Sequence, residues 1–83
     1  MHPLRVIFNR IIWNNKERKE DYEITYIHRG ATNDRKTIHM NSITKVEKST
    51  FIYADNGAET TIPLHRVLIV RNIKTGNIIW KKV

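Results

Sequence analysis

The hydrophobic residues of this chain change their spacing once, and this change constrains the fold more than any other feature. Near the start, apolar side chains recur every three or four residues, which places them on one face of a helix. These residues are Leu4, Ile7, Phe8, Ile11 and Ile12. Pro3 suits a first helical turn and Asn14-Asn15 favours termination, so the spacing predicts a helix over residues 3–13.

From residue 22 onward the spacing is that of strands. One face of the first alternating run holds Tyr22, Ile24, Tyr26 and His28, which is typical of a strand. Asn56-Gly57 lies between two β-rich runs and predicts a hairpin. Gly76 predicts another turn before residues 78–80. Residues 14–21 are interpreted as a charged, solvated connector.

A short pattern occurs twice, in residues 37–46 and 61–70, with the form Thr-Ile-x-apolar-x-x-apolar-x-x-Val. We interpret each copy as a strand end, a bend and a second strand, so that the two copies form similar corners. The chain is therefore predicted to be a single α+β domain over residues 1–83. One N-terminal helix packs on a curled, mostly antiparallel sheet of five or six strands. The helix either covers one face of this sheet or plugs the end of a barrel-like form.

The composition favours a polyanionic partner. Fifteen Lys and Arg against eight Asp and Glu give a formal net charge of +7, and nucleic acid is the commonest polyanion for such a protein. Cysteine, a signal-peptide pattern and an apolar run of about 20 residues are all absent from the sequence, so we expect a cytoplasmic protein with no membrane partner. Phosphate-binding loops and zinc-ligand spacings are absent too, so we expect no cofactor and no metal.

A His-Arg pair occurs twice, as His28-Arg29 and as His65-Arg66. Both pairs lie at predicted strand ends, where side chains can converge. An arginine fork binds phosphate oxygens bidentately, and an imidazole donates to them or adds charge when protonated. The two pairs therefore indicate a phosphate site, provided that they meet in space.

Tyr26 lies two residues before His28 on the same predicted face, where its ring can stack on a base of single-stranded RNA. The alternative is that Tyr26 belongs to the core with its hydroxyl reaching the surface. A second alternative concerns Arg29 and Arg66, which can instead form surface ion pairs with Asp34 or Glu59.

Characteristic blocks extend over nearly the whole chain: His2-Pro3-Leu4-Arg5, Ile12-Trp13, Tyr26-Ile27-His28-Arg29-Gly30-Ala31 with Asp34, Ile62-Pro63-Leu64-His65-Arg66-Val67-Leu68, Gly76 and Trp80. They resemble a small archaeal family of uncharacterised proteins whose domain is described as an RNA cyclic-group end recognition domain. Some relatives have Pro-Gly-Asp where this chain has Thr32-Asn33-Asp34, so the acid is kept while the turn differs.

The resemblance implies binding of RNA 3′ ends that carry a 2′,3′-cyclic phosphate, in RNA repair or processing and beside enzymes of those processes. Asp34 would then orient an arginine or bond a ribose hydroxyl, and Arg5 would contact the adjacent backbone. The full set of expected RNA-binding residues is His2, Arg5, Tyr26, His28, Arg29, Asp34, His65 and Arg66.

Two other functions remain open at this point. In a ribonuclease or cyclic phosphodiesterase, His28 and His65 would act as general base and general acid. In a protein-interaction or assembly domain, an exposed sheet edge would pair with another chain, including a further copy of this one.

Overall fold

A computed structural model describes residues 3–13, 16 and 18–82. The helix α1 spans Pro3–Trp13, as the apolar spacing predicted, and buries Leu4, Phe8 and Ile11. These residues follow one another at i, i+4 and i+7, so one stripe of the helix faces the protein interior. His2, Asn14 and Asn15 lie outside the described residues.

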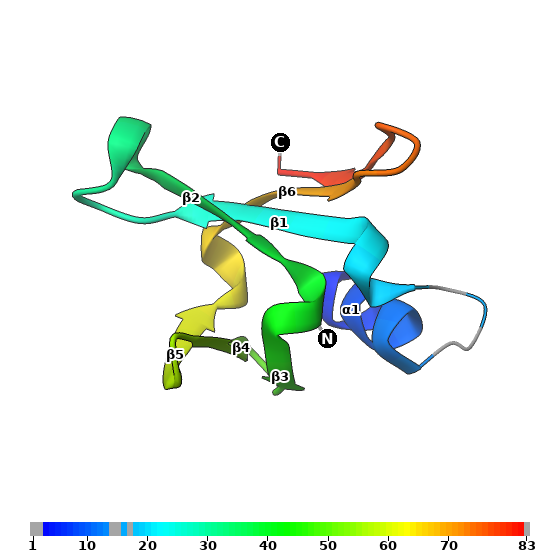
Figure 1. The fold of residues 1–83 in the computed structure, drawn as a ribbon, viewed down its shortest axis with the longest axis horizontal. Coiled ribbons are helices and arrows are strands. Elements are labelled where there is room, and N and C mark those ends of the chain that lie inside the picture. Colours follow the sequence, from blue (N-terminus) through cyan, green and yellow to red (C-terminus); the bar gives the residue numbers. More distant parts are fainter. Residues whose placement is uncertain (1–2, 14–15, 17, 83) are drawn as a thin grey trace.

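The described strands form two antiparallel sheets (Figure 1). The four-stranded sheet has the order β2-β1-β6-β7 and consists of Arg35–His39, Tyr22–Ile27, Val67–Asn72 and Ile78–Lys81, respectively. The three-stranded sheet has the order β3-β4-β5 and consists of Ile43–Val46, Thr50–Asp55 and Ala58–Pro63. The α+β class and the antiparallel pairing are thus confirmed. The expected single curled sheet of five or six strands is not what the structure shows.

Short 3₁₀ turns at the two copies of the repeated pattern explain this difference. The turn η3, Met40–Ser42, leads from β2 in one sheet to β3 in the other. The turn η4, Leu64–Arg66, leads from β5 back to β6 in the first sheet. The first residue of each turn, Met40 or Leu64, is buried. The copies are therefore corners, as expected, but they separate two sheets instead of curving one.

The tight turns follow the turn chemistry of the sequence. Asn56 and Gly57 adopt φ values of 52° and 83° and join β4 to β5, so the Asn-Gly hairpin is confirmed. Gly76, with a φ of 81°, lies in the connection between β6 and β7. The charged connector contains an unforeseen 3₁₀ turn, η1 at Lys19–Asp21, and another turn, η2, spans Thr32–Asp34.

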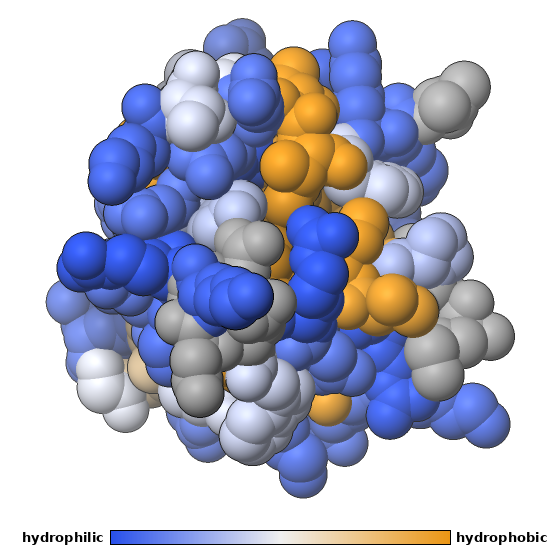
Figure 2. Space-filling view, turned by 90° about the vertical axis from the view of Figure 1, so that its right-hand side faces the viewer, coloured by the Kyte–Doolittle hydropathy of each residue, from blue (hydrophilic) through white to orange (hydrophobic). Residues whose placement is uncertain are grey.

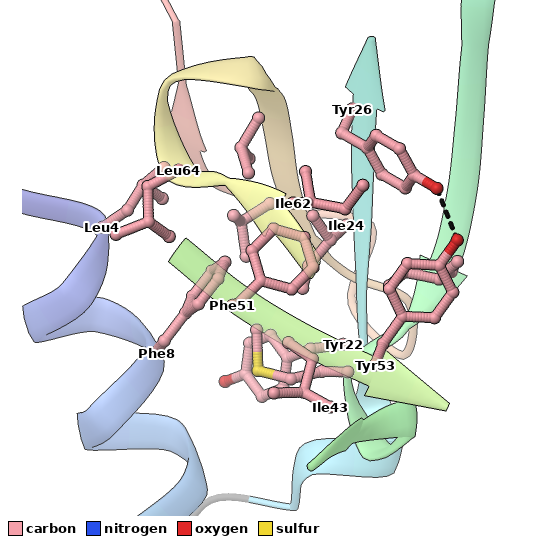
Figure 3. Packing of buried hydrophobic residues seen from close by; sticks show 14 of the residues in the cluster. Leu4, Phe8, Tyr22, Ile24, Tyr26, Ile43, Phe51, Tyr53, Ile62 and Leu64 are labelled. Carbon is pink, nitrogen blue, oxygen red and sulfur yellow. Dashed lines mark hydrogen bonds between the residues drawn. The ribbon is translucent and has the colours of Figure 1, made fainter. Parts of the chain in front are cut away.

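The hydrophobic core joins the helix to both sheets (Figure 3). Phe8 of α1 meets Phe51 of β4 edge to face, with ring centroids 5.6 Å apart. Tyr26 of β1 contacts the same Phe51 ring from the four-stranded sheet at 6.3 Å. Phe51 is thus the aromatic side chain at which the three layers meet.

A pair of tyrosine hydroxyls links the two sheets inside this core. The hydroxyls of Tyr26 and Tyr53 are 2.5 Å apart and form the hydrogen bond drawn in Figure 3. Burial raises the pKa of Tyr26 most, and the hydrogen bond with the Tyr53 hydroxyl raises it further. Towards the surface, the Lys36 ammonium lies 5.5 Å from the centre of the Tyr53 ring and 3.3 Å from an Asp55 carboxylate oxygen. The hydroxyl of Tyr53 and the carboxylate of Asp55 raise the pKa of Lys36.

On the side of the molecule shown in Figure 2, a strip of hydrophobic residues interrupts a largely hydrophilic surface. The exposed large hydrophobic residues of the described part are Val6, Trp13, Ile73 and Ile78. None of the described helices is long and apolar enough to cross a membrane.

The hydroxyl pair can be tested with a double-mutant cycle of Tyr26→Phe and Tyr53→Phe. Tyr53→Phe should lower the free energy of unfolding by about 1–3 kcal/mol, because it leaves the buried Tyr26 hydroxyl without this partner. The double variant should lose less than the sum of the single losses, since no hydroxyl is then left unpaired in the core. Urea unfolding of the four proteins measures this coupling, and additive losses would show that the two hydroxyls act independently.

Candidate nucleic-acid interface

The pairing of β1 with β6 brings the two His-Arg segments to the same end of the four-stranded sheet. In this antiparallel pair, Tyr26 lies opposite Val67. Residues 28–29 come directly after β1, and residues 65–66 come directly before β6. Both segments therefore adjoin the Tyr26–Val67 pair (Figure 1). His28, Arg29, His65 and Arg66 are all exposed there. Their segments are therefore neighbours, although they are far apart in the sequence.

A register shift occurs at this end of the β1–β6 pair. Thr25 pairs with Ile69 while the next residue, Tyr26, pairs with Val67, so Leu68 has no partner in β1. Such irregularities bend a strand and change the direction of its side chains. The carbonyl of Leu68 accepts a hydrogen bond from the backbone N–H of Lys82 at 2.8 Å. This bond holds the backbone of Lys82 next to the irregularity.

The loop after β1 is held closed by Asp34. The carbonyl of Asp34 accepts the backbone N–H of His28 at 2.9 Å, and its side-chain oxygen accepts the N–H of Gly30 at 3.3 Å. Asn33 and Asp34 adopt φ values of 58° and 54°, a region that Asn and Asp tolerate better than most residues. Asp34 thus shapes the loop that presents His28 and Arg29, and no described ion pair joins it to an arginine.

The turn η4 presents His65 and Arg66 beside the first turn of α1. Figure 3 shows Leu4 of α1 and Leu64 of η4 pointing toward each other, and both belong to the core cluster. Arg5 follows Leu4 and is half-buried, and its Nε atom is enclosed without a hydrogen-bond partner in the described part of the chain. The Arg5 guanidinium is therefore held partly against the protein body, in the helical turn that packs beside η4 (Figure 3).

Tyr26 does not fit the expected stacking role. Its side chain is only 1% exposed and contacts Phe51, Tyr53 and His28. No ring face is left for a base, and the core alternative describes this residue better. The His28 ring meets the Tyr26 ring edge to face, with ring centroids 6.0 Å apart. The buried tyrosine thus packs against the exposed histidine and restricts its ring. His2 lies outside the described residues, and its place in the site stays a prediction.

The same end of the sheet contains cations that the sequence analysis missed. Arg35 is the first residue of β2 and lies opposite Ile27 at the end of β1. Lys81 lies opposite Ile69, and the Lys82 ammonium donates to the carbonyl of His65 at 2.6 Å. Only the strand order brings these residues together, because neither β2 nor β7 has a local motif that marks them. We call the exposed residues His28, Arg29, Arg35, His65, Arg66, Lys81 and Lys82 the cationic end.

The arginines of the cationic end are free to bind an anion. Ion pairs between two described side chains include Arg18–Glu20, Lys36–Asp55 and Arg71–Glu23, and none of these involves an arginine of the cationic end. Glu59, considered above as a partner for Arg66, instead accepts a hydrogen bond from Thr44. The described residues contain no cluster of three or more His, Cys, Asp or Glu side chains that would hold a metal ion.

Fold and site together define a small basic α+β protein with a cationic surface suited to phosphate. The chain belongs to the family described as the MJ1316 RNA cyclic group end recognition domain, whose model matches residues 1–82. This confirms the resemblance found in the sequence.

Several archaeal relatives extend over nearly the whole chain. A UPF0248 protein of Methanococcus vannielii is 41% identical over 80 residues, which cover 96% of this chain and 92% of the relative. The UPF0248 protein MJ1316 of Methanocaldococcus jannaschii is 40% identical over 79 residues, or 95% of this chain and 92% of the relative. One from Saccharolobus islandicus is 34% identical over 74 residues, or 89% and 91%. No solved structure matches this chain.

Anion binding at the cationic end can be tested without RNA. Inorganic phosphate should raise the thermal midpoint of the wild-type protein above its value in chloride of equal ionic strength, because a ligand of the folded state stabilises it. Arg29→Ala combined with Arg66→Ala should remove most of this rise, measured by differential scanning fluorimetry. Lys19→Ala combined with Lys74→Ala removes equal charge near the opposite end of the sheet and should leave the rise intact. Equal losses in the two double variants would mean that only net charge matters.

Proposed function

We propose that the cationic end binds the 3′ end of RNA that carries a 2′,3′-cyclic phosphate, in RNA repair or processing. The observation that supports this proposal most directly is the Tyr26–Val67 pairing, from which both His-Arg segments extend. The family description names the same class of ligand. The protein would work in the cytoplasm, beside the enzymes that make or consume such ends, and the proposal needs no cofactor.

The arginines, the histidines and Arg5 have three different roles in this proposal. Arg29 and Arg66 hold the non-bridging phosphate oxygens, since guanidinium forks suit this geometry. His28 and His65 donate to the same group, and the Tyr26 ring keeps the His28 ring in place. Arg5, which is half-buried in the first turn of α1, contacts the adjacent RNA backbone.

Discrimination between phosphate forms must come from shape. A linear terminal monophosphate has a charge of about −1.5 to −2 near neutral pH, whereas a cyclic phosphate is a diester with a single negative charge. A site that responded only to charge would therefore prefer the linear form. Preference for the cyclic form would mean that the donors match two non-bridging oxygens on a closed ring.

Binding of matched RNAs tests the proposal. We expect wild-type protein to bind an oligonucleotide ending in a cyclic phosphate at least about tenfold more tightly than the same oligonucleotide ending in hydroxyl or linear phosphate, a difference of about 1.4 kcal/mol. Arg29→Ala with Arg66→Ala should abolish this preference. The same double variant should reduce the slope of log affinity against log salt by about 0.7, because both arginines hold the one terminal phosphate and each single-strand phosphate contact contributes about 0.7.

A double variant that removes equal charge away from the cationic end is the control. Lys19→Ala with Lys74→Ala should keep the preference for the cyclic end. Equal affinity of the wild type for all three ends would disprove end recognition. Conversion of the cyclic end during incubation, lost in both His28→Ala and His65→Ala, would instead show a cyclic phosphodiesterase.

A further inference from the structure

A pocket beside an exposed tryptophan lies apart from the four segments of the cationic end. Trp13, the last residue of α1, is 79% exposed. It lines a pocket of about 150 Å³ together with Asn9 and Ile12 of the helix and residues 43–46 of β3. An aromatic face this open is a ready surface for stacking, and neither the core nor the proposed end-binding site uses it.

The helix connects this pocket with the cationic end. Arg5, Asn9 and Trp13 are spaced at i, i+4 and i+8, so they follow one face of α1. Arg5 lies in the first turn, next to η4, and Trp13 lies eight residues further, or about 12 Å at 1.5 Å per residue. A strand of RNA held at the cationic end can therefore follow this helix face to the pocket.

The chemistry of the pocket suits a nucleobase better than a phosphate. Ile12, Ile43 and Val46 supply apolar surface, and Asn9 supplies a side-chain amide that can donate and accept. Thr44 donates to the Glu59 carboxylate at 3.0 Å, which places an anionic acceptor next to the pocket. That carboxylate would repel a phosphate but can accept from the amino group of a base. Lys45, which is exposed at the pocket, can contact the RNA backbone beside the bound base.

We propose that this pocket is a second RNA subsite, in which a base of the single strand stacks on Trp13 while the 3′ terminus occupies the cationic end. This subsite rests on the proposed end-binding function, because the bound 3′ terminus sets where the RNA strand begins. At a stacked spacing of about 3.4 Å per nucleotide, 12 Å corresponds to about three or four nucleotides. The base bound at Trp13 therefore belongs to a nucleotide about three or four positions before the one whose backbone Arg5 contacts.

The test measures affinity against RNA length in the wild-type protein and in Trp13→Ala. All the RNAs end in a cyclic phosphate, and they run from a dinucleotide to a hexanucleotide. For the wild type, affinity should rise about fivefold to a hundredfold once the strand is long enough to reach Trp13, which is the range for one base–aromatic stack. Trp13→Ala should bind the dinucleotide as the wild type does and should lose this rise. Trp13→Phe should recover part of it.

Two controls separate stacking from damage to the helix. Val6→Ala removes another exposed apolar side chain from α1, outside the pocket lining, and should keep the rise with length. Tryptophan fluorescence of the wild type should be quenched by hexanucleotide but not by dinucleotide, and Trp13→Ala should lose this response. The far-ultraviolet circular dichroism of Trp13→Ala should match that of the wild type, because the side chain is mostly exposed.

Failure of the base subsite and failure of end recognition would give different results. The subsite is disproved if Trp13→Ala binds long RNA as the wild type does, or if it weakens dinucleotide and hexanucleotide equally. If hydroxyl and cyclic ends bind alike but the Trp13-dependent rise persists, end recognition fails and the base subsite stands. If neither protein gains affinity with length while the cyclic end is still preferred, end recognition stands and the pocket does not bind RNA.

Discussion

The structure depends on the antiparallel pairing of β1 with β6. This pair forms the centre of the four-stranded sheet, and β2 and β7 each add to one side of it. It also joins a strand from the first half of the chain to one near its end, and it brings together two segments that no local interaction would connect. Because strand register fixes which side chains lie opposite each other, the candidate site is a direct product of this pairing.

The local structure could be predicted well from the sequence. The bounds of α1 follow from apolar spacing and Pro3, and the Asn56-Gly57 hairpin follows from turn chemistry. The division into two sheets could not be foreseen, because a bend within one sheet and a corner between two sheets have the same repeated pattern. Arg35, Lys81 and Lys82 were missed for a related reason, since only the partner strands reveal their position. Tyr26 was expected to stack on a base but is buried. An aromatic residue before a polar strand end can therefore belong to the core or to the surface, and the sequence does not distinguish the two.

The distribution of charge separates two kinds of basic residue. Lys36 and Arg71 lie within 3.3 and 2.6 Å of carboxylate oxygens and help to hold strands together. Beside the cationic end, the carboxylate of Asp34 accepts a hydrogen bond from Gly30 within its own loop and forms no ion pair with a described arginine. Clustered exposed cations repel each other within a Debye length, about 8 Å at physiological salt, and a polyanion relieves this repulsion. The fold thus keeps apart the charges that stabilise it and those available to a ligand.

The corner turns η3 and η4 limit which segments of the chain can change in length. Each corner lies between buried residues of two strands: Ile38 and Ile43 flank η3, and Ile62 and Val67 flank η4. Because side chains alternate between faces, inserting or deleting one residue there would turn the following strand inside out. The connection between β6 and β7 has no such restriction, and no residue of the proposed site lies in it. Length differences among homologous proteins should therefore accumulate in that segment, while both corners keep an invariant number of residues.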